Sequence, residues 1–197
     1  MGRPRSYASA EVLSAAMRAF RRYGYAGTSL DTLTRTTGLK RGSLYNAYPG
    51  KRALFVAALA DYANATVGHV ERTLSVAADP LAGVAEALRR VARAATSADG
   101  RHGCLLANTA AELGARDAEI QAMVAAAFAR LEAAYAGAFS RAQQSGQLRA
   151  DADPATIGRL CVALTHGLRV LAASGAEERE LQAVVEAALG AVTRYAP

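Results

Sequence analysis

A short polar segment over residues 37–51, TGLKRGSLYNAYPGK, carries side chains that suit contact with nucleic acid. It holds both lysines of a chain whose other basic residues are all arginine. Arginine can pair with guanine O6 and N7, while hydroxyl and amide groups reach base edges or phosphates. The candidate groups are Lys40, Arg41, Ser43, Tyr45, Asn46 and Lys51. We interpret them as a polyanion-binding surface, the alternative being a small core with a solvated charged face.

The distribution of charge supports the first interpretation. Residues 1–60 hold ten Lys and Arg against two acidic residues, a formal charge of +8. The whole chain has a net charge of +6, so the remaining residues carry −2. A basic segment joined to a larger near-neutral one is typical of a polyanion-binding head and a body with another task.

A second candidate for chemistry is Cys104, in RHGCLLANTAAEL. An expected helix N-terminus, Arg101 and His102 all favour its thiolate, so Cys104 is a candidate sensor of electrophiles, and a small buried side chain is the alternative. A thiol-dependent enzyme would also need a base, such as His102 or His69, and an orienting group, and the spacing supplies neither. HExxH and CxxC motifs are missing, so we expect no enzyme, no cofactor and no bound metal.

The composition predicts an all-helical protein. The chain has 197 residues, of which 52% are hydrophobic and 6% aromatic, with no Trp, a balance that favours helices over sheets. Its two cysteines, Cys104 and Cys161, lack paired motif spacing and are expected to be reduced. Without a signal-peptide pattern or a run of about 18 apolar residues, we expect a soluble cytoplasmic protein with no membrane partner.

Apolar positions recur at three-and-four spacing and predict about nine helices and no strand. Thr28 and Ser29 offer hydroxyls to cap the second helix, and Gly38 suits the turn after it. Asp79-Pro80 and Asp153-Pro154 are typical helix starts. Helices are expected over about 9–23, 30–37, 40–47, 51–74 or beyond, 80–95, 104–113 and 154–173. Two more helices are expected to bear the apolar stripes from Ile120 to Phe139 and from Leu181 to Val192.

The second and third of these helices form a helix-turn-helix, whose second helix can enter the major groove of DNA. We therefore expect a three-helix DNA-binding domain over residues 1–50. A larger helical domain for ligand binding and dimerisation is expected over residues 51–197.

The stretch GYAGTSLDTLTRTTGLKRGSLYNAYPGKRALF resembles the helix-turn-helix signature of the TetR family of bacterial transcriptional regulators. The shared features are the Tyr23-Gly24 pair, Thr28, Gly38, the SLY core and Lys51, and the resemblance covers about residues 9–60. It implies a regulator, most simply a repressor, that binds a palindromic operator as a homodimer. A small-molecule inducer bound to the second domain would release it from DNA.

By position, four residues resemble contacts to the DNA backbone and three resemble base-reading ones. Lys40 stands where many family members have a capping Ser or Thr, which weakens the cap in exchange for charge. Tyr48 stands where they have Phe, which leaves a phenol near the DNA backbone. The backbone group is Thr28, Tyr45, Asn46 and Lys51, and the base-reading group is Lys40, Arg41 and Ser43.

In the second domain, polar groups interrupt the apolar stripes, as in a mainly apolar cavity for a small molecule. Each is alternatively a core residue. The candidates for the inducer site are Tyr62, His69, Cys104, Asn108, Phe128, Tyr135 and His166.

A homodimer is expected because one helix-turn-helix makes few contacts, and half-sites about 34 to 36 Å apart need a two-fold partner. In the helix over 154–173, the small residues Gly158, Ala163, Gly167 and Ala172 allow a close helix crossing. The alternative is that these faces complete the core of one chain. The interface candidates are Leu160, Leu164, Gly167, Leu168, Leu171, Leu181, Val185 and Leu189.

Two other functions remain as alternatives. A thiol-dependent enzyme would use Cys104. A nonspecific DNA-compacting protein would explain the basic head but would leave the large second domain without a task.

Overall fold

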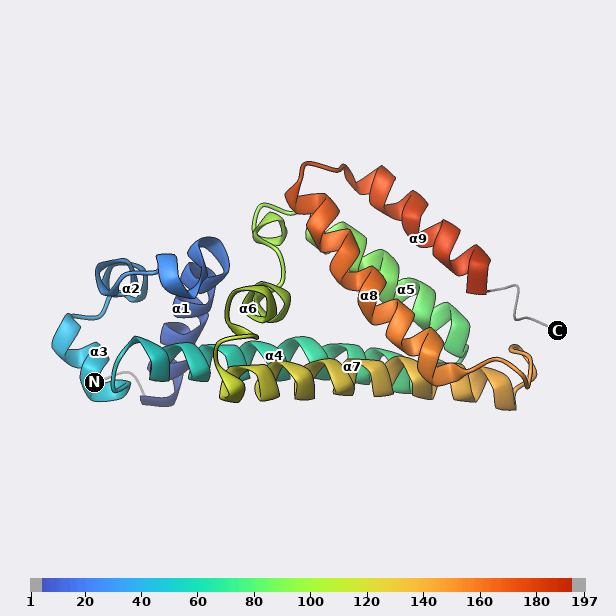
Figure 1. The fold of residues 1–197 in the computed structure, drawn as a ribbon, viewed down its shortest axis with the longest axis horizontal. Coiled ribbons are helices and arrows are strands. Elements are labelled where there is room, and N and C mark those ends of the chain that lie inside the picture. The colour runs from blue at the N-terminus through green and yellow to red at the C-terminus, as the bar shows by residue number, and fades with distance from the viewer. Residues whose placement is uncertain (1–4, 193–197) are drawn as a thin grey trace. The chain divides into compact units, whose positions relative to one another are not determined.

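The computed structural model describes the backbone of residues 5–192 and the side chains of residues 10–192. Within that range the chain is all-helical, with nine α-helices, one short 3-10 helix and no strand, as predicted (Figure 1). The α-helices are α1 Arg5–Gly27, α2 Leu30–Thr37, α3 Arg41–Ala47, α4 Lys51–Val76, α5 Pro80–Ala95, α6 Leu105–Leu113, α7 Ala118–Gln144, α8 Pro154–Ala173 and α9 Glu178–Val192, and the 3-10 helix η1 is Gly100–His102.

The helix starts follow the expected capping chemistry. The Asp79 side chain accepts from the Ala82 amide ahead of Pro80, and the Asp153 side chain accepts from the Ala155 amide. Ser29 caps α2 by accepting from the Thr32 amide. These side chains satisfy first-turn amides that have no partner inside the helix, which is why the predicted starts are confirmed.

The first helix is longer than predicted. We expected its end at Tyr23 because Gly24 follows, and Gly24 does leave the helical region, with φ 72° and ψ 176°. The chain then makes one more helical turn, so α1 reaches Gly27 across a kink. The kink sets the direction in which the chain enters α2.

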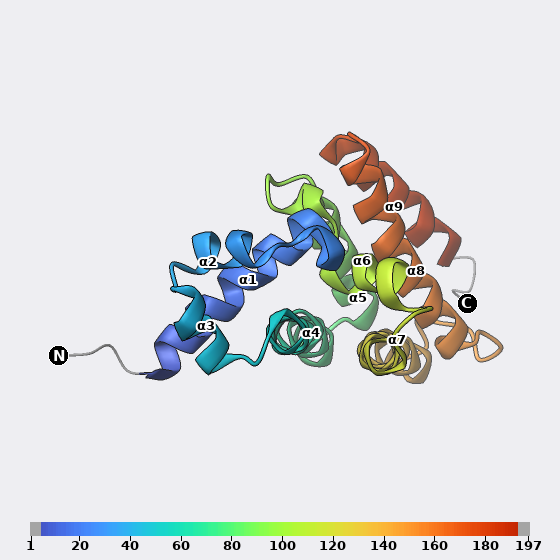
Figure 2. The same ribbon diagram turned by 60° about the vertical axis from the view of Figure 1, so that its left-hand side comes forward.

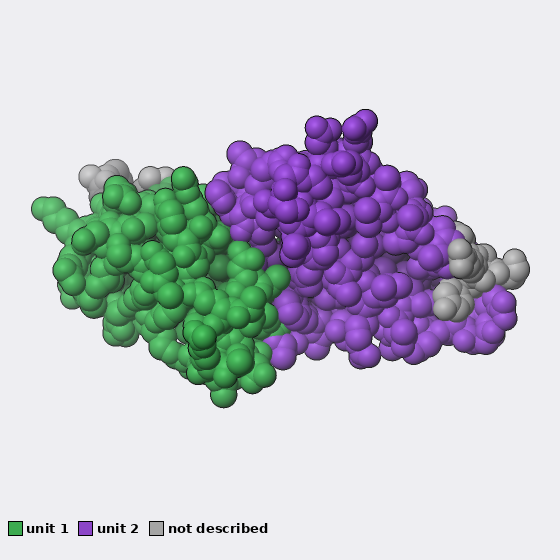
Figure 3. All heavy atoms as spheres, turned by 45° about the horizontal axis from the view of Figure 1, so that its top comes forward, with its two compact units in different colours: residues 1–65, 105–124 green, residues 66–104, 125–197 purple. Residues whose placement is uncertain are grey.

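The structure divides into two compact units (Figure 3). Unit 1 comprises residues 1–65 and 105–124, and unit 2 comprises residues 66–104 and 125–197. Unit 1 therefore includes α6 and the first part of α4 together with the expected DNA-binding helices. The functional boundary after residue 50 stays a prediction.

In unit 1, α2 packs on α1 and α3 packs on α2 (Figure 2). The core of this unit holds Phe20, Leu33, Leu44, Leu54 and Phe55, all nearly inaccessible to solvent. In unit 2, α5 packs against both α8 and α9.

Among the described residues, two helices, α7 and α8, are long and apolar enough to cross a membrane by length and composition, with a mean hydropathy of 1.2 in their most apolar windows. A third of each window is buried inside the chain. The core helices of soluble helical proteins have the same composition, and we interpret α7 and α8 in that way.

One of the small residues on α8 has a role inside the chain. Gly158 is buried, and a Cβ added there would lie 2.9 Å from both the Ala136 amide nitrogen and the Glu132 carbonyl oxygen of α7. Its lack of a side chain allows α8 to cross α7 closely, so Gly158 serves packing within one chain and not between two chains.

Gly158→Ala should therefore lower the free energy of unfolding by about 1–3 kcal/mol, the usual cost of overpacking a core. Urea denaturation followed by circular dichroism measures this change. Gly137→Ala on α7 is the matched control, because a Cβ there has no neighbour within 4 Å. Equal stability of the two variants would contradict the close crossing.

Candidate nucleic-acid interface

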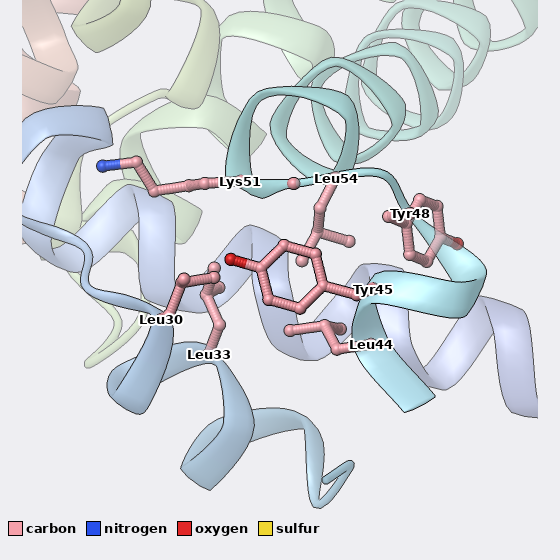
Figure 4. Close-up of a pocket in the computed structure, with 8 residues that line it drawn as sticks. Leu30, Leu33, Leu44, Tyr45, Tyr48, Lys51 and Leu54 are labelled. Carbon is pink, nitrogen blue, oxygen red and sulfur yellow. The ribbon is translucent and has the colours of Figure 1, made fainter. Parts of the chain in front are cut away.

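The helix α3 presents nearly all of its side chains to the outside. Of its seven residues only Leu44 is buried, with 3% of its surface exposed. Leu44 lines a small pocket together with Leu30, Leu33 and Leu54 among others (Figure 4). The exposed polar residues of α3 and its N-cap are Lys40, Arg41, Ser43, Tyr45 and Asn46. The structure thus brings together five of the predicted DNA-binding residues on one exposed surface.

Lys40 occupies the N-cap of α3 in an extended conformation, and its side chain makes no capping hydrogen bond. This confirms the weaker cap expected from a lysine at this position. Since no side chain occupies the cap, the first turn of α3 offers its positive dipole end beside two cations, Lys40 and Arg41.

Two tyrosines border the same surface. Tyr45 is 42% exposed, and the Arg41 guanidinium lies 6.0 Å from the centroid of its ring, one helical turn away. Tyr48 is partly buried, and both tyrosines line the same pocket as Leu44 (Figure 4). The tyrosines therefore pack at the base of α3 beside its exposed polar residues.

Thr28 does not fit the predicted role. It is fully buried, and its hydroxyl donates to the Gly24 carbonyl at 2.5 Å and lies 3.5 Å from the Ala19 carbonyl. The prediction that its side chain contacts the DNA backbone is therefore wrong. The hydroxyl instead donates to the carbonyl of Gly24, the residue at the kink in α1.

Lys51 has a contact that the sequence did not indicate. Its ammonium donates to the Tyr25 carbonyl at 3.0 Å and lies 4.4 Å from the centroid of the Tyr25 ring. That ring packs against Phe20 and Phe55, at centroid distances of 6.3 and 4.9 Å. Lys51 thus joins the start of α4 to the end of α1, and its other N–H groups remain as possible donors to a phosphate.

The predicted inducer residues fall in both units. Tyr62 and Asn108 belong to unit 1, and the other five belong to unit 2. His69 lies on α4, and its backbone carbonyl accepts a hydrogen bond from the Thr73 hydroxyl at 2.9 Å. Three of these candidates lie on α7 and α8. Phe128 of α7 contacts His166 of α8, and Tyr135 of α7 is buried.

Two of these residues are in contact, and the third is buried on the same helix as Phe128. The rings of Phe128 and His166 lie 4.7 Å apart between centroids. Both ring nitrogens of His166 are buried and have no hydrogen-bond partner among the described residues. Tyr135 is 2% exposed, and burial raises the pKa of its phenol, which therefore stays neutral. Buried polar atoms without partners are uncommon in folded proteins, so the His166 nitrogens are candidates to hydrogen-bond to a bound molecule or water.

Both cysteines are buried, and each is 3% exposed. Burial raises the pKa of the Cys161 thiol to about 12. Next to Cys104, Arg101 donates to the Ala172 carbonyl at 2.8 Å. The burial of Cys104 favours a packed side chain, and its role as a sensor stays a prediction.

The predicted dimer residues separate into an inner and an outer group. Leu168, Leu181 and Val185 are fully buried in the core of unit 2, so their assignment to an interface between chains is wrong. Leu160 and Leu171 are 52% and 43% exposed. The outer group consists of Leu160, Leu164, Gly167 and Leu171 on α8, with the partly buried Leu189 on α9, and the structure adds the exposed Val170 and Val184.

Comparisons with known proteins agree with this architecture. The family profile described as "Bacterial regulatory proteins, tetR family" matches residues 12–58. The profile described as "Tetracyclin repressor-like, C-terminal domain" matches residues 80–192. The first match covers α2 and α3, and the second covers most of unit 2.

Two curated relatives align along nearly the whole chain. The uncharacterized HTH-type transcriptional regulator YezE of Bacillus subtilis is 29% identical, over 96% of this chain and 98% of the relative. The HTH-type transcriptional repressor ComR of Escherichia coli is 25% identical, over 93% of this chain and 88% of the relative. Among solved structures, a cysteine mutant of the TetR family transcriptional regulator CifR, complexed with 26-bp double-strand operator DNA, superposes with a TM-score of 0.84. It is 32% identical and covers 96% of this chain and 99% of that chain.

The buried thiols lead to a prediction. In a Cys104→Ser variant, Cys161 should react with a thiol reagent at pH 8 far more slowly than a free thiol. A pKa of about 12 leaves about one thiolate in ten thousand at that pH, and the side chain is also shielded. Absorbance of the released thiolate gives the rate, and the same protein in denaturant is the control. Equal rates in buffer and in denaturant would contradict the burial.

Proposed function

Because the chain belongs to the TetR family of bacterial transcriptional regulators, we propose that it is a repressor that binds a palindromic operator as a homodimer and is released by a small-molecule inducer. The observation that carries the proposal is α3, where one buried leucine leaves a row of polar and basic side chains exposed. The repressor ComR and the operator-bound CifR support it as relatives.

We assign base recognition to the N-terminal part of α3. Arg41 has the planar group that pairs with guanine O6 and N7, and Lys40 and Ser43 flank it. Tyr45, Asn46, Tyr48 and Lys51 are assigned to the DNA backbone, where they fix the register of α3 in the groove. The charge of +8 over residues 1–60 supports this assignment by attracting the phosphates.

The outer faces of α8 and α9 support the dimer. Leu160, Val170 and Leu171 on α8 and Val184 on α9 are exposed apolar side chains on two packed helices. Two such faces from two chains would form a four-helix interface. A dimer also supplies the second α3 helix that a palindrome requires.

The contact of Phe128 with His166 and the buried Tyr135 on the same helix as Phe128 support an inducer site in unit 2. An apolar molecule with one or two hydrogen-bonding groups would pack on the Phe128 ring and pair with the His166 nitrogens. The protein needs no cofactor for this function, and as a regulator of transcription we place it in the cytoplasm.

The test is selection of genomic fragments bound by the purified protein. A shared palindrome should appear, and unrelated DNA should compete weakly at moderate salt. A DNA-compacting protein would instead bind all fragments alike, because its binding is purely electrostatic. Regulators and not enzymes make up this family, so the thiol-enzyme alternative is set aside.

Arg41→Ala should weaken operator binding by about 1–3 kcal/mol and should relax the preference at one base pair of each half-site, since a bidentate base contact is lost. Binding isotherms on single-base operator variants measure both effects. Arg90→Ala is the matched control, because Arg90 is an exposed arginine on α5 in unit 2. A uniform loss over all base variants would assign Arg41 to the backbone instead.

Lys51→Ala should weaken binding to operator and unrelated DNA alike and should lower the salt slope of log K by about one unit, because one phosphate contact disappears. Titrations at four salt concentrations give the slope. If affinity falls while the slope stays the same, Lys51 acts only through its bond to the Tyr25 carbonyl.

A further inference from the structure

A carboxylate from α6 holds the junction between α1 and α2. Glu112 accepts hydrogen bonds from the backbone amides of Tyr25, at 2.8 Å to Oε2, and Ala26, at 2.7 Å to Oε1. These groups lie more than 85 positions apart in the sequence, and all belong to unit 1. Both oxygens of one carboxylate are thus used on two successive amides.

The kink at Gly24 explains why a carboxylate is suitable there. Because Gly24 leaves the helical region, the Tyr25 and Ala26 amides stand at the start of a new helical turn. Amides in the first turn of a helix have no carbonyl partner within that helix. A carboxylate at the start of a helical turn makes charge-assisted bonds to these amides and also meets their aligned dipoles. Glu112 therefore acts as an N-cap that is delivered from another helix.

Gly24 is fitted to this carboxylate. Its φ of 72° is unfavourable for other residues, and a Cβ at this position would lie 2.8 Å from Glu112 Oε2. Glycine is thus favoured here both by the backbone conformation and by the space that the Glu112 side chain occupies.

The same junction is hydrogen-bonded to residues at the starts of α2 and α4, the two helices next to the proposed DNA surface. The Thr28 hydroxyl donates to the Gly24 carbonyl just before α2 begins, and Lys51 at the start of α4 donates to the Tyr25 carbonyl. The amides of this junction are held by Glu112 and its carbonyls by Thr28 and Lys51. Its position therefore sets where α2, α3 and the start of α4 lie relative to α6.

A second tie between the head and the α6–α7 region is weaker. Arg52 on α4 pairs with Asp117 and with Glu119, each at 2.8 Å, but the arginine side chain is 47% exposed. Exposed ion pairs between flexible side chains contribute little to stability. Glu112 is half-buried and holds backbone groups that are already fixed, so it is the stronger tie.

We propose that Glu112 is a positioning residue for operator recognition, which fixes the α1–α2 junction to α6 so that α3 meets DNA in one orientation. This inference rests on the proposed function.

The first experiment compares full-length Glu112→Gln and Glu112→Ala with the parent protein. Hydrogen exchange followed by NMR should show the Tyr25 and Ala26 amides exchanging at least tenfold faster, while the Leu33 and Leu44 amides keep their rates. Affinity for the selected operator should fall at least tenfold, and affinity for unrelated DNA should stay within twofold, because the electrostatic contacts are kept. Glu86→Gln on α5 is the matched control, since it removes an exposed carboxylate from unit 2.

The outcomes separate the two proposals. If the parent protein shows no preference for any DNA sequence, the proposed function fails, and the exchange rates still test the hold of Glu112 on the junction. If the two amides exchange faster but operator affinity is unchanged, the positioning role is overturned. If exchange at these amides is unchanged, the two hydrogen bonds do not hold the junction in solution, and the inference is overturned as well.

A double-mutant cycle tests the fit of Gly24 to the carboxylate. Gly24→Ala should weaken operator binding more in the parent protein than in the Glu112→Ala background, because the added Cβ meets Glu112 only in the parent. The combined loss should therefore be smaller than the product of the two single losses. A strictly multiplicative result would show that the two residues act independently, against the inference.

Discussion

The burial of Leu44 is the interaction on which the recognition surface depends. A seven-residue helix is far below the length at which an isolated helix is stable in water, and α3 buries no other side chain. Burying one leucine contributes about 1.5–3 kcal/mol, enough to hold a short helix only against a rigid partner. The advantage of so small an anchor is that nearly every other position of α3 faces outward and is free for recognition. The requirement is that the surface receiving Leu44 must itself be fixed.

That surface is fixed by the junction at Gly24 and by the aromatic cluster beside it. Phe20, Tyr25 and Phe55 pack together, with Phe20 and Phe55 edge to face at 4.9 Å between centroids. At the kink, the distant Glu112 accepts from the Tyr25 and Ala26 amides, while the nearby Thr28 and the more distant Lys51 donate to the Gly24 and Tyr25 carbonyls. A local break in α1 thus becomes the point at which α2, α4 and α6 are joined. Polar groups near a helix break are costly to leave unpaired, which makes these contacts a requirement of the fold.

The parts of the fold that follow local rules could be predicted from the sequence, and the parts that depend on distant contacts could not. Gly38 ends α2 at φ 70°, as a glycine before a turn predicts, and the Asp-Pro pairs start α5 and α8. The position of Thr28 before α2 was evident, but its burial and its bond to the Gly24 carbonyl accompany a kink that periodicity does not reveal. The role of Glu112 depends on an amide 87 positions away, for which no local pattern exists.

The helix α8 also shows what the sequence alone could not predict, and its exposed apolar face favours contact with a second chain. Its apolar residues recur on two faces, and spacing alone could not say which face the chain itself covers. Cys161, Leu168 and Ala172 turn inward, whereas Leu160 and Leu171 remain exposed. A helix that is apolar on both faces is normally covered on both, which accounts for its membrane-like hydropathy and favours a second chain as the other cover. Such a pairing would also compensate for the small size of α3. The two α3 helices of one dimer would bind a palindrome with far more discrimination than either alone, because the second contact becomes intramolecular.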